Sequence, residues 1–122
     1  MIRRRVLFVD DERLLTAAVG DILSEHHDVV IASTAADAIR RVQEDGGFDV
    51  VLCDVQLTDG TALDVHAAYR AAWPGREHRL VLVTGGTDLP GVRALIDGGQ
   101  PVLLKPFDPD ELAVLIDRLA SS

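Results

Sequence analysis

The chain has 122 residues, of which 48% are hydrophobic, and its 12 basic and 20 acidic residues give a formal net charge of −8. This length and hydrophobic content predict a single domain, residues 1–122, with a core of its own. The acidic balance argues against direct binding of nucleic acid by this domain, because a phosphate backbone requires a basic surface.

The sequence also predicts where the protein resides. Its apolar runs are all too short to cross a membrane, so we expect no membrane insertion. Residues 1–5 lead straight into an apolar run of strand length, which does not resemble a signal peptide. The one cysteine, Cys53, can form no internal disulfide, which fits a reducing compartment. A cytoplasmic location is therefore expected.

The first part of the chain predicts two strands and two helices. A strand is expected over residues 5–10 and a helix over 12–24, with an apolar stripe that includes Leu14 and Ile22. The short apolar run 29–31 predicts the second strand, and a segment of helical periodicity follows it.

The rest of the chain repeats this alternation three times. The apolar runs 50–54, 80–84 and 102–104 predict strands, and each is followed by a segment of helical periodicity. The turn Asp59-Gly60 is expected to start the third helix. Asp108, which precedes a proline, is expected to be the N-cap of the last helix.

Alternating strands and helices predict an α/β fold. Right-handed crossovers place the helices on both faces of a single parallel sheet. We therefore expect a doubly wound (βα)₅ domain of the flavodoxin-like type, with strand order 2-1-3-4-5. In such a sheet, ligands bind at the carboxyl ends of the strands.

Polar side chains follow four of the predicted strands at this edge. Asp10 and Asp11 follow the first strand, Asp54 ends the third, Thr84 the fourth, and Lys105 follows the fifth. Lys105 is also the only lysine of the chain, since the other 11 basic residues are arginine. A lysine ammonium reaches a phosphoryl oxygen as a flexible point charge. Three acids, a hydroxyl and an ammonium together predict a site for a metal ion and a phosphoryl group.

The expected metal ion is Mg²⁺. Three neighbouring carboxylates repel one another, so the site requires either a retained proton or a cation. Oxygen ligands with open positions suit Mg²⁺, whose shell is completed by water and phosphate oxygens, whereas no EF-hand spacing is present for calcium. Zinc is disfavoured because Cys53 is expected to be buried filler and the histidines are scattered without evident partners. We expect surface or helix-face positions for these histidines, which are His26, His27, His66 and His78.

With Mg²⁺ bound, an ionised carboxylate can attack a phosphoryl group and form an aspartyl phosphate. We predict that Asp54 is this phosphate acceptor. Lys105 would neutralise one phosphoryl oxygen, and Thr84 would donate a hydrogen bond to another. Backbone N–H groups after Asp54 would bind the rest.

The ordered set of these motifs resembles the receiver domain of two-component response regulators, over essentially the whole chain. The motifs that carry the resemblance are Asp10-Asp11, Asp54, Asp59-Gly60, Thr84 and Lys105-Pro106-Phe107. The resemblance implies that Asp54 accepts a phosphoryl group from a phosphohistidine of a histidine kinase or histidine phosphotransfer protein. It also implies that the chain is a regulatory phosphoacceptor domain and not an enzyme. Such a domain catalyses only its own phosphorylation and slow dephosphorylation.

The resemblance also implies a ligand set. Asp11, Asp54 and the backbone carbonyl of Gln56 would bind Mg²⁺ directly, and Asp10 would contribute through water. Thr84 and Lys105 would grip the phosphoryl group. The Lys105-Pro106 peptide would be cis, as bonds before proline can be.

Three departures from the family pattern stand out. Thr58 occupies the fourth position after the phosphoacceptor, where receivers commonly carry proline, and the loop that begins Gly85-Gly86 is about one residue shorter than usual. Val102 stands where receivers carry the tyrosine or phenylalanine that turns inward on activation. The usual threonine–aromatic switch therefore cannot operate, and we expect the signal to pass through altered loop order or through the position of the fourth helix.

Two rival functions remain at this stage. One is a hydrolase that works through an aspartyl phosphate, although such enzymes usually place an Asp-x-Asp nucleophile motif at the first strand. The other is a degenerate receiver that acts only as a protein-binding module, against which the complete set of acids, Thr84 and Lys105 argues. The sequence leaves open whether the domain stands alone, belongs to a larger parent chain or forms a weak homodimer.

Overall fold

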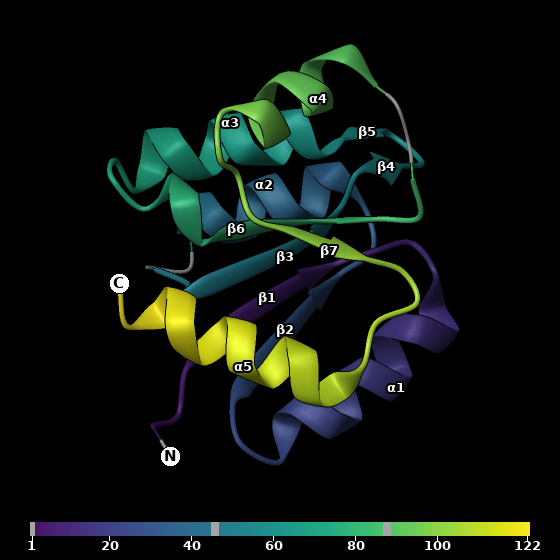
Figure 1. The fold of residues 1–122 in the computed structure, drawn as a ribbon, viewed down its shortest axis with the longest axis vertical. Coiled ribbons are helices and arrows are strands. Elements are labelled where there is room, and N and C mark those ends of the chain that lie inside the picture. The colour runs from purple at the N-terminus through teal and green to yellow at the C-terminus, as the bar shows by residue number, and fades with distance from the viewer. Residues whose placement is uncertain (1, 45–46, 87–88) are drawn as a thin grey trace.

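The computed structural model describes residues 2–44, 47–86 and 89–122. Within these residues, five strands form a parallel sheet in the order β2-β1-β3-β6-β7, and β4 and β5 form a separate antiparallel pair (Figure 1). The elements in chain order are β1 (Arg5–Val9), α1 (Arg13–Ser24), β2 (Asp28–Ala32), α2 (Ala35–Glu44), β3 (Val50–Asp54), β4 (Gln56–Leu57), β5 (Gly60–Thr61), α3 (Ala62–Ala72), the 3₁₀ helix η1 (Glu77–Arg79), β6 (Leu80–Thr84), α4 (Pro90–Asp97), β7 (Val102–Leu104) and α5 (Pro109–Ala120).

This strand order confirms the predicted doubly wound sheet, because β6 and β7 are its fourth and fifth strands. β1 lies between β2 and β3, and Leu7 has Val30 and Val51 as its register partners. The predicted cap of α5 is also confirmed, since the Asp108 carboxylate accepts a hydrogen bond from the Asp110 N–H at 2.8 Å. The sequence pattern did not predict β4, β5 and η1, which are too short to show periodicity.

Alternate side chains of the central strands enter two separate cores. In β3, Val51 and Cys53 belong to one core, and Val50 and Leu52 belong to the other. Figure 1 shows α2, α3 and α4 on one face of the sheet and α1 and α5 on the other. Strands buried on both faces are continuous apolar runs in the sequence, which is why they could be predicted.

Part of the predicted apolar stripe of α1 is wrong. Leu14 is 86% exposed and Ile22 is 44% exposed. Small and polar residues take part of the buried face, and a Cβ at Gly20 would lie only 3.0 Å from the Cδ1 of Ile31 in β2. The buried residues of α1 are Thr16, Val19, Gly20 and Leu23. At Gly20, α1 thus lies close to β2.

The β4–β5 hairpin is tied to the beginnings of two helices. The Asp59 carboxylate accepts hydrogen bonds from the N–H groups of Ala35 and Ala36, at 2.7 and 3.0 Å, and so caps α2. α3 starts two residues after the predicted turn, where Thr61 and Asp64 form a capping box. Sequence spacing shows the turn but not the long-range cap, whose partners are 24 and 23 residues apart.

His27 contradicts the prediction that the histidines have surface positions without partners. Its side chain is buried, and its Nδ1 accepts a hydrogen bond from the Arg4 N–H at 3.1 Å. Burial lowers the pKa of His27, with a further contribution from the charge of His26. His78 also has a partner, since its Nε2 lies 2.9 Å from the Ser122 Oγ. His27 therefore joins the turn between α1 and β2 to the segment before β1.

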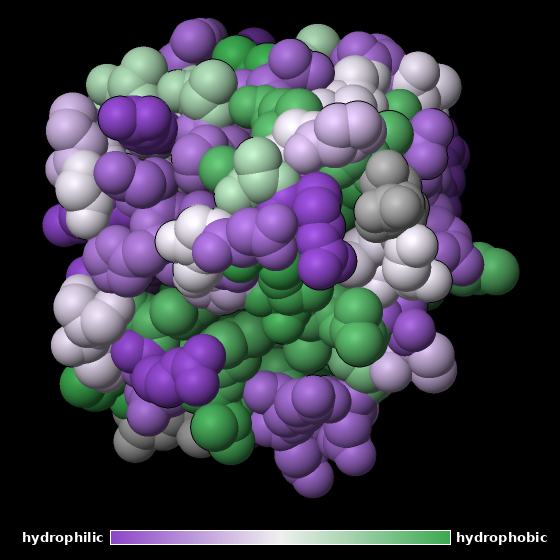
Figure 2. Space-filling view, turned by 45° about the horizontal axis from the view of Figure 1, so that its top comes forward, coloured by the Kyte–Doolittle hydropathy of each residue, from purple (hydrophilic) through white to green (hydrophobic). Residues whose placement is uncertain are grey.

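Hydrophobic side chains also reach the surface. Figure 2 shows them gathered in the lower half of that view, among hydrophilic ones. Leu104 in β7 is 64% exposed and Val114 in α5 is 70% exposed. In the part of the chain that the structure describes, no helix is long and apolar enough to span a bilayer.

Candidate functional site

The carboxyl ends of four strands meet at one edge of the sheet. Asp10 follows β1, Asp54 ends β3, Thr84 ends β6, and Lys105 follows β7. Asp54 is the register partner of Val83, and the Lys105 N–H donates to the Thr84 carbonyl at 2.8 Å. Strand pairing alone therefore places these four residues on neighbouring strands at the same edge.

Three carboxylates converge at this edge. Asp10, Asp11 and Asp54 each offer a carboxylate oxygen, and these oxygens all lie within 4.8 Å of one another. The Asp10 side chain is fully buried, that of Asp54 is 17% exposed, and Asp11 is exposed. The Asp10 Oδ1 accepts a hydrogen bond from the Glu12 N–H at 2.9 Å. The cluster thus has a closed inner side and an open outer side.

Lys105 supplies a positive charge between two of the acids. Its Nζ lies 2.9 Å from the Asp10 Oδ2 and 3.5 Å from the Asp54 Oδ2. Burial would lower the pKa of Lys105, but the hydrogen bond to Asp10 and the charges of Asp54 and Asp10 outweigh it and raise the pKa. The peptide bond between Lys105 and Pro106 is cis. Lys105 is therefore charged at neutral pH and close to Asp54.

The environment of Asp54 favours its protonated form. Burial is the largest cause of its raised pKa, followed by the negative charge of Asp10, while the charge of Lys105 acts in the opposite direction. A cation beside Asp54 would remove part of this repulsion and favour the ionised carboxylate. The cluster of three carboxylates and one ammonium therefore suits a further positive charge.

Thr84 ends β6 inside the site, and the two glycines after it are exposed. Thr84 is buried, and its Oγ1 accepts a hydrogen bond from the Gly86 N–H at 3.1 Å. A Cβ built at Gly85 or Gly86 would meet no atom within 4 Å, although the φ of +109° at Gly86 suits glycine. The predicted loop continues through Thr87 and Asp88, which lie outside the described residues.

The remaining predicted residues lie close by in the chain. Gln56 begins β4, two residues after Asp54, and is exposed. Cys53 is buried, as predicted, and burial raises the pKa of its thiol.

Sequence reasoning missed one contact of the cluster. The Thr58 hydroxyl donates a hydrogen bond to the Asp11 Oδ2 at 2.8 Å. Thr58 was noted only as a departure from proline, and no periodicity or spacing links it to a residue 47 positions earlier.

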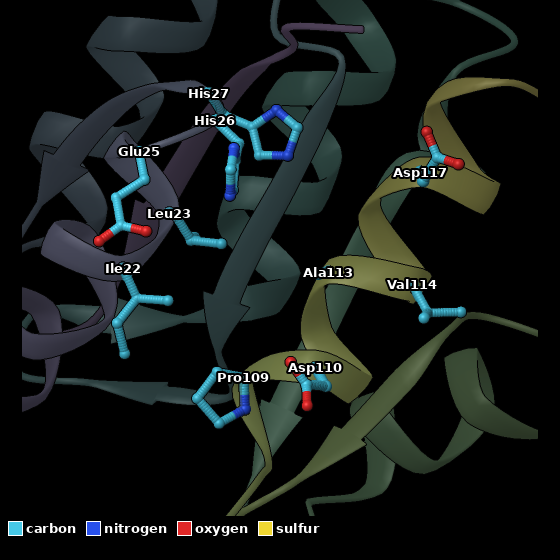
Figure 3. A pocket seen from close by; sticks show the side chains of 10 residues that line it. All are labelled: Ile22, Leu23, Glu25, His26, His27, Pro109, Asp110, Ala113, Val114 and Asp117. Carbon is cyan, nitrogen blue, oxygen red and sulfur yellow. The ribbon is translucent and has the colours of Figure 1, made fainter. Parts of the chain in front are cut away.

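An open groove of about 550 Å³ lies elsewhere, between α1 and α5 (Figure 3). Apolar side chains such as Ile22 and Val114 line it together with the acidic Glu25, Asp110 and Asp117. None of the three clustered carboxylates, nor Lys105, is among its lining residues. The chemistry at the sheet edge therefore does not take place in this groove.

Comparison with known proteins identifies the family of the chain. The family model described as the response regulator receiver domain matches residues 6–117. The transcriptional regulatory protein CpxR of Escherichia coli K12 is 29% identical, over 92% of this chain and 47% of CpxR. The DNA-binding transcriptional regulator NtrC of Rhizobium meliloti is 32% identical, over 93% of this chain and 23% of NtrC. The chain thus spans less than half the length of these curated relatives.

Solved structures show the same fold. A CheY-like response regulator receiver domain protein from Methanospirillum hungatei has a TM-score of 0.84 and 24% identity, covering 98% of this chain and 94% of that one. The receiver domain of the sensor histidine kinase PA1611 from Pseudomonas aeruginosa has a TM-score of 0.82 and 22% identity, covering 98% and 99%. That crystal structure has a magnesium ion coordinated in its active-site cleft.

Proposed function

Because this chain belongs to the response regulator receiver domain family, we propose that Asp54 is its phosphoacceptor. The observation that carries the proposal is the position of Asp54 at the end of β3, within 3.5 Å of the Lys105 ammonium and beside two further carboxylates. An oxygen of the ionised Asp54 carboxylate attacks the phosphorus atom. The bond from phosphorus to the donor nitrogen breaks, and the imidazole of the donor histidine leaves with the electron pair.

The other side chains stabilise the transferred group. The Lys105 ammonium neutralises a phosphoryl oxygen, and the Thr84 hydroxyl donates a hydrogen bond to a second one. Thr84 ends β6 and Lys105 directly follows its neighbour β7, so strand pairing supports the proximity of the two residues. This division of roles matches phosphoryl transfer, in which positioning and charge neutralisation supply most of the catalysis.

The donor set fits Mg²⁺. Three carboxylates and one ammonium leave a net charge of −2 when all are ionised, and their oxygens lie close enough to share one ion. Asp11, Asp54 and the Gln56 carbonyl would hold it, with Asp10 contributing through water. The ion would supply Lewis-acid charge neutralisation. The magnesium ion of the PA1611 receiver domain supports the same assignment.

The wider setting follows from the same family. We propose that residues 1–122 form one cytoplasmic receiver domain, which accepts its phosphoryl group from a histidine kinase or histidine phosphotransfer protein. Since the chain covers less than half of its curated relatives, a larger parent chain is the proposed context of its output. No steady turnover of a small substrate is expected, only self-phosphorylation and slow loss.

Intact-protein mass spectrometry tests the proposal. The protein is incubated with MgCl₂ and acetyl phosphate beside Asp54→Asn, which keeps the shape of the side chain but cannot form the acyl phosphate. We expect the wild type to gain the mass of one phosphoryl group, and we expect neither Asp54→Asn nor a chelator-treated sample to do so. A folded wild type that gains no phosphoryl group from either acetyl phosphate or a phosphohistidine protein would refute the assignment.

A further inference from the structure

The Asp11 carboxylate is held differently from its neighbour. Asp10 is buried and bonded to both the Glu12 N–H and Lys105. Asp11 is exposed, and among the described residues the Thr58 hydroxyl is the single hydrogen-bond donor to its carboxylate, at 2.8 Å. Without Thr58, the Asp11 side chain would be free to take other rotamers in solvent.

Thr58 lies in the turn of the β4–β5 hairpin, which is held in place by contacts to the rest of the domain. It lies with Asp59 between β4 and β5, whose register pairs Leu57 with Gly60. Leu57 is buried in the core, and Asp59 accepts hydrogen bonds from the first N–H groups of α2. Thr61, at the far end, caps α3. The hairpin is therefore fixed on three sides, and its tip presents the Thr58 hydroxyl to Asp11.

We propose that Thr58 is a positioning residue, which orients Asp11 toward the metal site and raises its affinity for Mg²⁺. The inference rests on the proposed function, in which Asp11 is a metal ligand. A hydroxyl that donates to one oxygen of a carboxylate leaves the other oxygen available and fixes the plane of the group. Outer partners of this kind commonly change metal affinity 10- to 100-fold when removed.

The contact also joins two loops across the site. Asp11 lies in the loop between β1 and α1, and Thr58 lies two residues after Gln56, whose carbonyl is the other proposed ligand outside the sheet. The hydrogen bond thus connects the β1–α1 loop, which carries Asp11, to the β4–β5 hairpin, which carries Gln56. A proline at position 58 could not make this bond, because proline has no side-chain donor.

Two variants separate the hydroxyl from the bulk of the side chain. Thr58→Val is nearly isosteric but has no donor, and Thr58→Ser keeps the donor but loses a methyl group. Both are titrated with MgCl₂ while the amide ¹H–¹⁵N signals of Asp11, Glu12 and Val55 are followed. We expect Thr58→Val to raise the Kd for Mg²⁺ about 10-fold, and Thr58→Ser to stay close to wild type.

A second measurement excludes a merely structural role. In the presence of chelator, the two variants should melt at temperatures close to that of the wild type, because Thr58 is on the surface side of the turn. Equal Kd values for wild type and Thr58→Val would overturn the inference and leave the proposed function intact. Equal losses in both variants would also overturn it, since the hydroxyl would then be irrelevant. A wild type without Mg²⁺ binding would instead refute the metal assignment and this inference with it.

Discussion

The charges around Asp54 have consequences for stability as well as for reactivity. Because the folded state raises the pKa of Asp54 above its ordinary value of 3.8, an ionised Asp54 destabilises the fold without a metal ion. This cost is absent below the unfolded pKa, where both states are protonated, and is fully present above the folded pKa. Without a metal ion, the cluster therefore lowers the stability of the fold above the folded pKa of Asp54.

Asp54→Asn removes this cost. In chelator at pH 7 we expect the variant to melt higher than wild type, on the order of 3 °C, which corresponds to about 1 kcal/mol in a domain of this length. The partial exposure of Asp54 keeps the gain small. The difference should shrink as the pH falls toward 3.8, because wild-type Asp54 then takes up its proton. Thermal melts across this pH range measure it, and a variant less stable than wild type at pH 7 would contradict the prediction.

Lys105 stabilises the fold, in contrast to an ionised Asp54, because its ammonium lies beside the buried carboxylate of Asp10. Lys105→Met would leave Asp10 without its counter-ion, and removing one member of a buried pair commonly costs about 3 kcal/mol or more. We expect a loss of about 2–3 kcal/mol in chelator, because the Glu12 N–H still serves Asp10, with partial recovery in MgCl₂. Urea unfolding in chelator and in MgCl₂ measures the loss of stability and its partial recovery. Arg118→Met, the same change of charge at an exposed position of α5, should cost far less.

At the scale of single elements, the β4–β5 hairpin caps the N-termini of two helices, α2 and α3. The pKa of Asp59, which caps α2, reflects this role. Hydrogen bonds from the N–H groups of Ala35 and Ala36 lower its pKa below 3.8. A carboxylate at a helix N-terminus also interacts favourably with the helix dipole. Its stabilising contribution is therefore present above pH 3.8 and is lost as the pH falls through the lower folded pKa.

Asp59→Asn tests this element. The amide can still accept hydrogen bonds but carries no charge, so we expect a lower melting temperature than wild type at pH 7. The difference should stay constant well above pH 3.8 and narrow as the pH falls through the lowered folded pKa of wild-type Asp59, because protonation then removes the charge. Urea unfolding at a series of pH values follows it. A difference that already narrows between pH 7 and pH 5 would show that another group is responsible.

The elements also show how far the sequence could predict this molecule. The parallel strands, their order and the meeting of Asp10, Asp54 and Lys105 follow from apolar runs that end in polar residues. The exposure of Leu14 could not be predicted, because its apolar spacing fits the same stripe as the buried Val19 and Leu23. The Thr58 contact depends on the path of a turn, and such long-range pairs leave no periodic signal.

At the scale of the whole molecule, the open question is how phosphorylation reaches the surface when Val102 replaces the usual aromatic residue. Val102 is half-buried and packs against the core shared by α2, α3 and α4. It pairs with Leu82 in β6, and Lys105 is bonded to the Thr84 carbonyl. If a phosphoryl group displaced Thr84 and Lys105, the displacement would therefore reach β6, β7 and α4, which lies between them in the chain. No large aromatic ring would have to rotate.

Hydrogen exchange tests this route. With MgCl₂ and beryllofluoride as a phosphate mimic, we expect slower amide exchange at Thr84, in α4 and at Lys105, with little change in α2. The α2 amides serve as the internal control. This helix lies on the same face of the sheet as α4, but it connects β2 to β3 and not β6 to β7. Unchanged exchange from Thr84 to Lys105 in a protein that binds the mimic would exclude this route.

The order of the strands has a further consequence during synthesis. The three carboxylates belong to the first half of the chain, and Lys105 lies 95 residues after Asp10, beyond an edge strand. A growing polypeptide therefore carries its acid residues long before their counter-ion has been made. β7 can pair with β6 only after residues 102–104 have been made, and only then does the ammonium enter between Asp10 and Asp54. A copy truncated before β7 would contain Asp54 without the Lys105 ammonium, so under the proposed function we expect it to accept a phosphoryl group poorly.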